Sequence, residues 1–352
     1  MISTTSSFRT PILVILSGNK SFVLRSSHIF RDLKDLIKLI FPMAWDSTII
    51  TIATTPENID LFNIIRIEGI PEYKIVSLTP DGLSEILSGY YELIVTSPPE
   101  HPIHSTALRL TSALSENGFI ALDERFRSFS GLIVKFPLKA EVSSLNEYFL
   151  TKPPHPIDIV YTTMPHKVKD SGMKIIGVNI GENDEPSLRP PISILTEIIQ
   201  MLYNDPQNQI VLFGAENLKV RYQMIMHGLK VAPRGNATVF SALRLGLNSE
   251  LLAQAIPMCD LFISFDSFMM DLAVAFDVKT VCLVSRSAYL DLNYSNLKSI
   301  FSKWDYKKCN FICETKNRCP FIDDAESESE TCFYDFDIDK ILIATKELLN
   351  GN

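Results

Sequence analysis

The chain has 352 residues and 46% hydrophobic residues, so it is long enough for about two globular domains with packed cores. Its formal net charge of −8 gives no electrostatic reason to expect a nucleic-acid partner. No apolar run approaches the ~20 residues that span a bilayer, and the N-terminal apolar run at 12–16 is too short for a secretory signal. These features favour a cytoplasmic protein without a transmembrane segment.

The first half of the chain alternates apolar runs with segments of helical spacing. Runs typical of buried strands lie at 11–16, 46–53, 91–96 and 119–122, with shorter apolar pieces at 64–67, 74–78 and 132–134. Helices are expected from the turn at 17–20 to about residue 40, and at 81–87 and 106–114. Strands that alternate with helices predict a parallel, doubly wound α/β sheet.

A proline-rich stretch separates the two halves. Five prolines fall within residues 137–172, which show no sustained periodicity. Such composition is typical of a linker or a domain edge. We predict an N-terminal domain at 1–150, a linker at 151–172 and a C-terminal domain at 173–352.

The second half repeats the α/β pattern. Strands are predicted at 174–179, 209–213, 261–264 and 280–284. Helices are predicted after Pro191 and at 218–228, 251–258, 268–276 and 338–349. Because methionine commonly fills irregular gaps in a core, we expect this role for Met224, Met226, Met269 and Met270.

A polar turn, Phe265-Asp266-Ser267, joins one of these strands to the following helix. In open α/β sheets, ligands bind where the chain leaves the carboxyl end of a strand. The first backbone N–H groups of a helix are unpaired and carry positive partial charge, which suits a phosphate. The alternative is that Asp266 or Ser267 only caps the helix.

The second half resembles the C-terminal domain of the family 9 glycosyltransferases, the heptosyltransferase family. The similarity runs over residues 174–345 and is carried by the segments KIIGVNIG, SLRPPISILTEIIQML, IVLFGAENL and LAQAIPMCDLFISFDSFMMDLAVAFDVKTVCLV. It implies a GT-B architecture, in which two Rossmann-like domains face each other across a cleft and the second holds the nucleotide sugar.

The same resemblance implies a reaction and its partners. The reaction would be inverting transfer of a heptose or hexose from a nucleotide-diphosphate donor to a saccharide, lipopolysaccharide-type or protein acceptor. No organic cofactor is implied. The protein would be cytoplasmic or peripheral at the inner face of the membrane, and a homo-oligomer is one of the assemblies it suggests.

The resemblance also assigns donor-binding residues. Asp266 and Ser267 would hold the diphosphate, and Glu216 would accept hydrogen bonds from the ribose. Arg189 and Arg286 would supply positive charge, since a guanidinium suits phosphate. Each assignment has a plainer alternative: a helix cap for the turn residues, and a solvated surface charge for Glu216 and the two arginines.

Three positions depart from the pattern of the family. Phe268 stands where glycine is usual, and brings a bulky side chain to a turn that phosphate should approach. Asp271 stands where histidine is usual, and its charge would repel a diphosphate. Asn19 stands where the family has its catalytic aspartate, and an amide cannot serve as a base. These departures favour an alternative function, a catalytically silent GT-B scaffold or assembly subunit.

A substitute base would have to come from another strand end at the same sheet edge. Glu100 and His101 follow the predicted strand at 91–96, and Asp123 and Glu124 follow the strand at 119–122. Ordinary loop polarity explains all of them equally well. Glu100 and His101 are the candidates that we carry forward.

The six cysteines form two groups. Cys259 and Cys282 lie in apolar strands and are expected to be core thiols. The others fall within 24 residues near the C-terminus, with three, five and twelve residues between them: Cys309, Cys313, Cys319 and Cys332. Four such thiolates predict a closed, structural metal site, with zinc as the generic metal and iron, which similar clusters in the family bind, as the second choice. Four reduced cysteines without a metal are the alternative.

Overall fold

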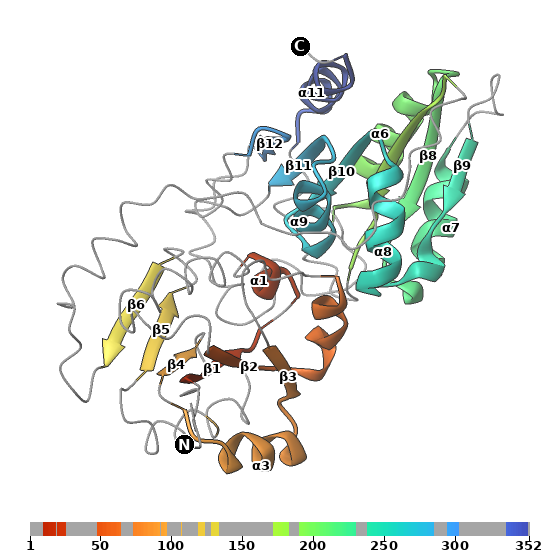
Figure 1. Ribbon diagram of the computed structural model, residues 1–352. Helices are drawn as coiled ribbons and strands as arrows, with labels where there is room; N and C mark the ends of the chain where they lie inside the picture. The colour runs from red at the N-terminus through yellow and green to blue at the C-terminus, as the bar shows by residue number, and fades with distance from the viewer. Residues whose placement is uncertain are drawn as a thin grey trace, which may run out of the picture. The chain divides into compact units, whose positions relative to one another are not determined.

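The computed structural model divides into two compact units, Met1–Thr162 and Thr163–Asn352 (Figure 1). The predicted linker at 151–172 lies almost wholly outside the residues that the structure describes, so its boundaries stay predictions. The described residues are 10–18, 20–25, 48–64, 73–91, 93–96, 107, 119–123, 128–133, 172–182, 190–229, 238–284, 294–302 and 336–350.

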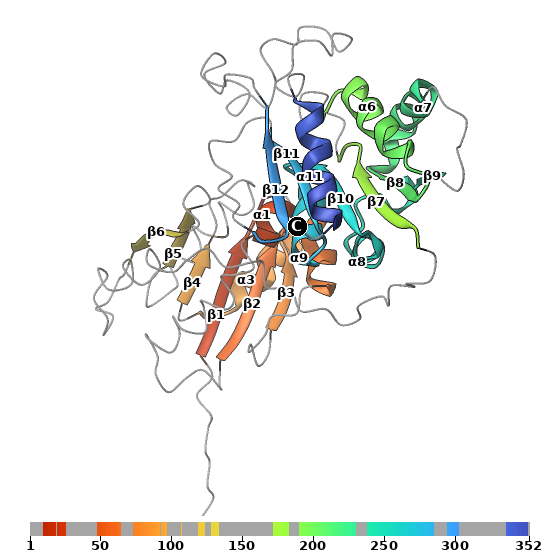
Figure 2. The same ribbon diagram turned by 90° about the horizontal axis from the view of Figure 1, so that it is seen from above.

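Unit 1 contains one six-stranded sheet in the order β3-β2-β1-β4-β5-β6 (Figure 2). All neighbours are parallel except β5 and β6, whose antiparallel ladder has an irregularity between Ala121 and Leu122. The central strand β1 is fully buried from Ile12 to Leu16, as its uninterrupted apolar run predicts. The strands are β1 Thr10–Leu16, β2 Thr48–Thr54, β3 Tyr73–Ser77, β4 Leu93–Thr96, β5 Phe119–Asp123 and β6 Ser128–Ile133.

Short helices connect the strands of unit 1. They are α1 Lys20–Arg25, the 3-10 helix η2 Pro56–Asn63 and α3 Pro80–Ser88. The hydroxyl of Thr79 accepts a hydrogen bond from the backbone N–H of Gly82 and caps α3. A side chain at Gly82 would come within 1.8 Å of the carbonyl oxygen of Ser77, so the turn between β3 and α3 requires glycine there. The predicted helix from residue 20 is described only as far as Arg25.

Unit 2 contains a second six-stranded sheet, in the order β12-β11-β10-β7-β8-β9, and all its pairs are parallel. Counted along the chain, this is the doubly wound order 3-2-1-4-5-6, with the reversal of direction between β7 and β10. The strands are β7 Lys174–Asn179, β8 Asn208–Phe213, β9 Thr238–Ser241, β10 Leu261–Phe265, β11 Thr280–Val284 and β12 Leu297–Phe301.

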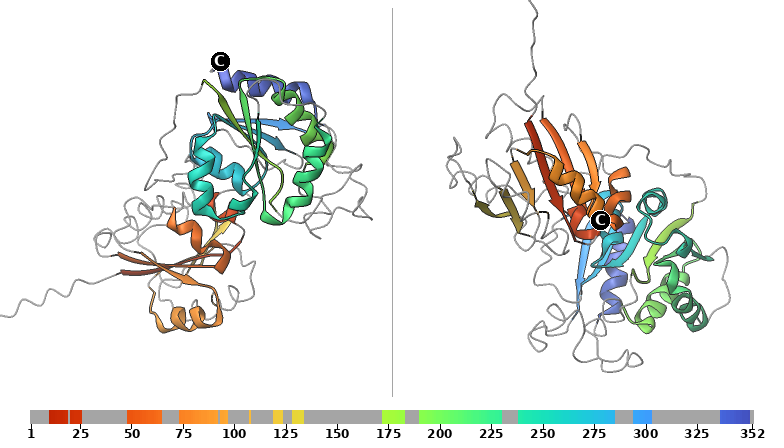
Figure 3. Two further views of the ribbon diagram at one scale, coloured as in Figure 1. Left: turned by 90° about the vertical axis from the view of Figure 1, so that its right-hand side faces the viewer. Right: turned by 90° about the horizontal axis from the view of Figure 1, so that it is seen from below.

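Helices cover both faces of the second sheet (Figure 3). Cys282 and Val284 of β11 pack with Met270 and Val274 of α9 on one face. Val281, on the alternate side of β11, belongs to a larger core cluster built with α6, α7 and α11. The helices are α6 Ile192–Tyr203, η4 Glu216–Leu218, α7 Lys219–Gly228, η5 Leu243–Leu245, α8 Ser249–Ala255, η6 Ile256–Met258, α9 Phe268–Ala275 and α11 Ile338–Asn350.

The predicted α/β class and most predicted elements agree with the structure to within about two residues, which is the usual uncertainty of element ends. Cys259 and Cys282 are buried, as expected. The short outer strands β9 and β12 and the helix η2 were not predicted. The expectation for Met224 was wrong, because this side chain points away from the core and is 54% exposed.

Candidate functional site

The reversal point of the second sheet brings three segments together at the carboxyl ends of β7 and β10. Val178 of β7 lies opposite Ile263 of β10, so Asn179 and Ser264 follow side by side. The chain leaves β7 through Gly181 and leaves β10 through the turn that begins α9. Because α6 and α9 cover opposite faces of the sheet, the two connections diverge here and leave polar groups at the edge.

Asn179 is the centre of a buried polar network. Its side chain is 1% exposed. Its Oδ1 accepts a hydrogen bond of 3.0 Å from the backbone N–H of Gly181. Its Nδ2 lies 3.1 Å from each of three acceptors: Ser264 Oγ, Ser267 Oγ and Glu182 Oε1. Since an amide nitrogen carries two hydrogens, these three acceptors share two donors.

Ser267 is the N-cap of α9. Its hydroxyl accepts a 3.3 Å hydrogen bond from the backbone N–H of Met270 and lies 3.1 Å from the hydroxyl of Ser264. Ser267 therefore caps α9. Asp266, the preceding residue, is exposed at the same sheet edge.

Glu182 binds the first N–H groups of α9. Its Oε2 accepts a 3.0 Å hydrogen bond from the backbone N–H of Phe268, and its Oε1 accepts a 2.7 Å hydrogen bond from that of Met269. A carboxylate of the chain itself thus occupies the position where a helix start binds an external anion. The sequence gives no sign of this role of Glu182, because its partners lie 86 and 87 residues away along the chain.

Phe268 does not obstruct the turn in the way that the sequence suggested. Its ring is buried in the protein, with 4% of the residue exposed, and its backbone N–H points to Glu182. The expectation of a bulky side chain over the turn was therefore wrong. The N–H groups are covered by the carboxylate of Glu182 instead.

The environment of Glu182 disfavours its charged form. Burial raises the pKa of this carboxyl from the ordinary value of 4.5 to about 7. Hydrogen bonds from Met269, Ser267 and Phe268 act in the opposite direction, and the negative charge of Asp271 adds to the rise. Asp271 lies in the first turn of α9 and is 1% exposed. The repulsion that the sequence predicts between Asp271 and an anion thus acts on the carboxylate of Glu182.

The segment that carries Glu182 is fixed at its start by two neighbouring elements. Arg221 of α7, which is buried, donates from Nε to the carbonyl oxygen of Ile180 at 2.7 Å and from a terminal guanidinium nitrogen to that of Pro190. The backbone N–H of Ala215 donates to the carbonyl oxygen of Gly181 at 3.0 Å. Gly181 has φ of 148°, a conformation that favours glycine.

Glu216 lies at the carboxyl end of β8, next to the residue that binds Gly181. Its side chain is 68% exposed and lies 3.7 Å from Nζ of Lys219. Because the Glu216 carboxylate is this exposed, it is accessible to a ligand, and its ion pair with Lys219 contributes little to stability. The exposed position of Glu216 fits both the ribose-binding and the surface-acid interpretations.

The carboxyl ends of β1 and β2 in the first sheet carry a different set of groups. Lys20 at the start of α1 pairs with Asp60 of η2 at 2.6 Å. The buried side chain of Asn58 donates to the carbonyl oxygen of Gly18 at 2.8 Å and to Thr55 Oγ1 at 2.9 Å. Asp60 is thus a carboxylate at this edge of the sheet that no pattern in the sequence indicates.

Several predicted site residues lie outside the described part of the chain. They are Asn19, Glu100, His101, Arg189, Arg286, Cys309, Cys313, Cys319 and Cys332. Within the part that the structure describes, no group of three or more His, Cys, Asp or Glu side chains is arranged to hold a metal. In the same part, no helix combines the length and apolarity that crossing a membrane requires.

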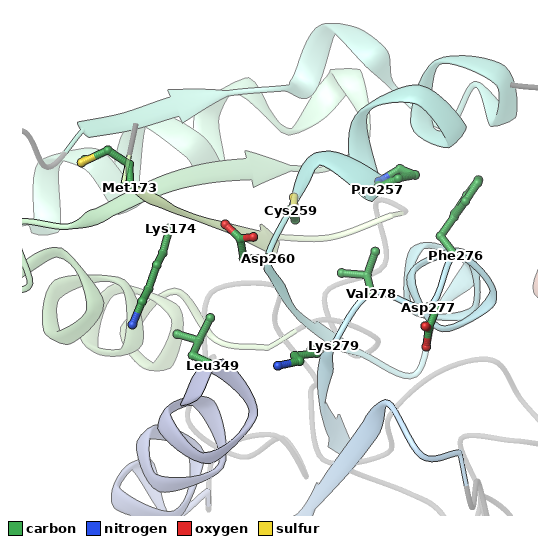
Figure 4. Close-up of a pocket in the computed structure, with 11 residues that line it drawn as sticks. Met173, Lys174, Pro257, Cys259, Asp260, Phe276, Asp277, Val278, Lys279 and Leu349 are labelled. Carbon is green, nitrogen blue, oxygen red and sulfur yellow. The ribbon is translucent and has the colours of Figure 1, made fainter. Parts of the chain in front are cut away.

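A cavity of about 500 Å³ lies at the opposite end of the second sheet, where β7, β10 and β11 begin (Figure 4). Two of its polar side chains have structural partners. Lys279 Nζ donates to the carbonyl oxygen of Leu348 at 2.6 Å, and Asp260 Oδ2 accepts from the backbone N–H of Ile175 at 2.8 Å. The cavity is therefore a weaker candidate than the reversal point.

Comparison with solved structures identifies the architecture. A glycosyltransferase family 9 protein from Veillonella parvula superposes with a TM-score of 0.65 at 14% identity, covering 97% of this chain and 98% of that one. The E. coli ADP-heptose LPS heptosyltransferase II gives 0.61 at 14% identity, covering 97% and 99%. The chain has the GT-B fold of the family 9 glycosyltransferases. No protein-family model and no curated protein matches the sequence significantly.

A third neighbour with the family 9 fold is the iron-containing dodecameric glycosyltransferase TibC from enterotoxigenic E. coli. It gives a TM-score of 0.54 at 10% identity and covers 97% of this chain and 77% of that one. At sequence identities this low, the structural similarity establishes a shared fold alone. The resemblance that the segments of the second half carry is thereby confirmed at the level of the fold.

Proposed function

We propose that this protein is a glycosyltransferase that moves a sugar from a nucleotide-diphosphate donor to a saccharide or protein acceptor, with inversion. The observation that supports this most is the start of α9. Two backbone N–H groups and the amide of Asn179 converge there on one pair of carboxylate oxygens. The same donors suit the oxygens of a phosphate. This arrangement stands at the reversal point of a doubly wound sheet, where such folds bind nucleotides.

The rest of the donor would extend from this point along the sheet edge. Glu216 is exposed at the end of the neighbouring strand β8, and a carboxylate there suits the two hydroxyls of a ribose. Asp266 and Ser267 would contact the diphosphate through the turn. Arg189 and Arg286 would offset the negative charge that Glu182, Asp266 and Asp271 place at this edge.

The chemical step would be a direct displacement. The acceptor hydroxyl oxygen forms a bond to the anomeric carbon, the bond from that carbon to the diphosphate oxygen breaks, and the nucleoside diphosphate leaves with the electron pair. A base takes the proton of the acceptor hydroxyl. Asn19 cannot do so, which leaves Glu100 and His101, with Asp60, after the carboxyl end of β2, as the additional candidate.

The transfer rates of single variants test the base. Because a general base contributes about a hundredfold or more, the correct one among Glu100→Gln, His101→Ala and Asp60→Asn should lower the rate by that factor. Donor affinity should stay unchanged in the same variant. Unchanged rates in all three would exclude these candidates.

The four C-terminal cysteines would hold a structural metal, zinc or iron, in this proposal. Four thiolates leave no open coordination position, so the metal would stabilise the fold without taking part in the transfer. The iron content and dodecameric assembly of TibC are compatible with this role and with a homo-oligomer. The heptosyltransferase fold favours an acceptor of the lipopolysaccharide type. The protein would reach such an acceptor as a peripheral protein at the inner face of the membrane.

Thermal unfolding with nucleotide sugars tests the proposal as a whole. ADP-, GDP- and UDP-sugars carry the diphosphate that α9 would bind, and a CMP-sugar, with a single phosphate, is the matched control. At a hundred times the Kd, a ligand adds about 3 kcal/mol of stability, which raises the Tm measurably. We expect at least one diphosphate sugar to raise the Tm at millimolar concentration.

A catalytically silent scaffold or assembly subunit is the second candidate. The specific observation in its favour is the carboxylate of Glu182, which already occupies the N–H groups of Phe268 and Met269. In that case no nucleotide sugar would raise the Tm, and no transfer would be detected.

A further inference from the structure

The carboxylate of Glu182 is bound in the way that an external anion would be. Its two oxygens receive hydrogen bonds from the two successive N–H groups at the start of α9, and Asn179 Nδ2 lies 3.1 Å from Oε1. The hydroxyl of Ser267, the N-cap of α9, lies 3.1 Å from the same Asn179 Nδ2. Asn179 and Ser267 are both more than nine-tenths buried. The protein therefore holds a complete anion site that is filled by one of its own side chains.

This resident anion is held in an environment that opposes its charge. The carboxyl has lost much of its contact with water, and Asp271 places a second negative charge in the same turn of α9. The charged residues on the surrounding elements are Asp266 before α9, Glu216 after β8 and Arg221 on α7. Arg221 is engaged with the carbonyl oxygens of Ile180 and Pro190.

We propose that Glu182 is a built-in competitor of the donor diphosphate, which occupies the start of α9 in the empty protein and leaves when a nucleotide sugar binds. The identity of the displaced ligand rests on the function proposed above. A rotation of the Glu182 side chain frees both N–H groups, because the backbone up to Gly181 is fixed separately by Arg221 and Ala215. The donor then gains these hydrogen bonds at the expense of those made by Glu182.

Competition predicts a dependence of binding on pH. Burial at the start of α9 raises the pKa of this carboxyl to about 7, whereas a carboxyl displaced into water keeps its ordinary value of 4.5. Displacement of Glu182 therefore releases a proton between these pH values, and the protonated side chain is the stronger competitor. Since the diphosphate diester of a nucleotide sugar does not titrate near neutrality, donor affinity should fall as the pH falls through about 7.

A permanent structural cap is the opposing explanation, and the two differ in one measurable respect. Removing a cap lowers the stability of the protein and leaves the donor with no new contacts. Removing a competitor frees two N–H groups and eliminates one negative charge, so the donor binds more tightly.

Isothermal titration of the full-length protein with ADP-glucose, GDP-mannose and UDP-glucose separates these explanations. The variants are Glu182→Ala and Glu182→Gln, with Glu197→Ala on the exposed side of α6 as the matched control. At about pH 8, Glu182→Ala should bind the donor about tenfold more tightly than the wild type, the value of one charge-assisted hydrogen bond. The difference in affinity should widen at about pH 6, and Glu197→Ala should behave as the wild type.

Each result decides between the proposals. If the wild type binds the donor and Glu182→Ala binds it equally well or more weakly, Glu182 is a cap. That result would overturn the competitor, while donor binding would stand. Binding by the variant alone would support both. No binding by any form would overturn both. If Glu182→Ala fails to fold, Glu182→Gln decides, because an amide that does not ionise should remove the pH dependence of donor binding. Donor binding by the wild type without that pH dependence would overturn the competitor.

Discussion

The two units of this protein share one strand order and differ in how they treat an acid that follows the carboxyl end of a strand. In unit 1, Asp60 faces the ammonium group of Lys20 at 2.6 Å. In unit 2, Glu182 is bound by backbone N–H groups and by neutral side chains, and Asp271 adds to the negative charge. Among the described residues, the first acid is neutralised by a cation and the second by dipoles.

The difference shows what the fold decides and what it leaves to individual side chains. The order 3-2-1-4-5-6 places a turn and a helix start at the edge of both sheets. A lysine there satisfies an acid permanently, because its ammonium group is a full charge. Backbone dipoles stabilise an anion without fixing which anion it is. The second edge is therefore the one suited to exchange its ligand.

The largest expected difference between the units concerns the four C-terminal cysteines, which belong to unit 2. If they hold a structural metal, the purified protein should contain about one equivalent of zinc or iron. Chelation should then lower the stability of unit 2 by several kcal/mol, since metal binding contributes directly to folding. Elemental analysis and thermal unfolding with and without chelator measure both effects.

The comparison in this prediction is the first unit, which has no cysteine in its sequence. Its unfolding should not respond to the chelator. Less than a tenth of an equivalent of any metal in untreated protein would show four reduced, unliganded thiols instead.

The buried amides of Asn179 and Asn58 form a matched pair across the two units. Asn179 has four partners, including Glu182 and Ser267, whereas Asn58 binds Gly18 and Thr55. Substitution by alanine leaves these buried partners unsatisfied, at a cost of about 1–3 kcal/mol for each partner. With about 1 kcal/mol for each, we expect Asn179→Ala to cost about 4 kcal/mol and Asn58→Ala about 2 kcal/mol in urea unfolding. Equal costs would show that the two additional partners of Asn179 contribute nothing to stability.

The sequence was sufficient for the fold because its strongest signals are local. Apolar runs such as 174–179 and 280–284 are buried on both faces of the sheet, and their length and flanking turns mark them as strands. The outer strands β9 and β12 were missed because they are short and partly exposed, with Phe240 and Phe301 about half exposed. The prediction for Met224 was wrong because helical spacing alone does not say which side of α7 faces the core.

The candidate site was only partly predictable, for a related reason. Ser267 could be found because a helix cap has a local signature. The role of Glu182 depends on contacts with Phe268 and Met269 across the sheet, and an acid in a polar turn gives no local sign of them. Its pKa is likewise set by burial and by Asp271, which are properties of the fold.

The pH dependence of stability sharpens the contrast at Glu182. A folded-state pKa of about 7 lies above the ordinary value of 4.5, so the folded protein binds more protons than the unfolded chain between these values. The contribution of Glu182 is therefore fully present below about pH 4.5 and is lost as the pH rises through 7. At 1.36 kcal/mol for each pH unit, the loss amounts to about 3 kcal/mol.

The measurement is the urea unfolding free energy of the wild type and of Glu182→Gln between about pH 5 and pH 8. The variant should lack this part of the pH dependence. Glu197→Gln corrects for the change in net charge. A pH profile shared by the wild type and Glu182→Gln would mean that Glu182 ionises as an ordinary surface acid.

Two ion pairs give the smallest expected effect and the last comparison between the units. The pair of Lys20 and Asp60 in unit 1 is largely buried, with side chains 15% and 28% exposed, whereas Lys219 and Glu216 in unit 2 are both 68% exposed and 3.7 Å apart. Double-mutant cycles should give about 1 kcal/mol for the first pair and no more than a few tenths for the second, because water screens exposed charges. A strong coupling between Lys219 and Glu216 would mean that Glu216 is held in place. In that case its carboxylate would not be free to accept the ribose of a donor, and only the α9 end of the proposed site would remain.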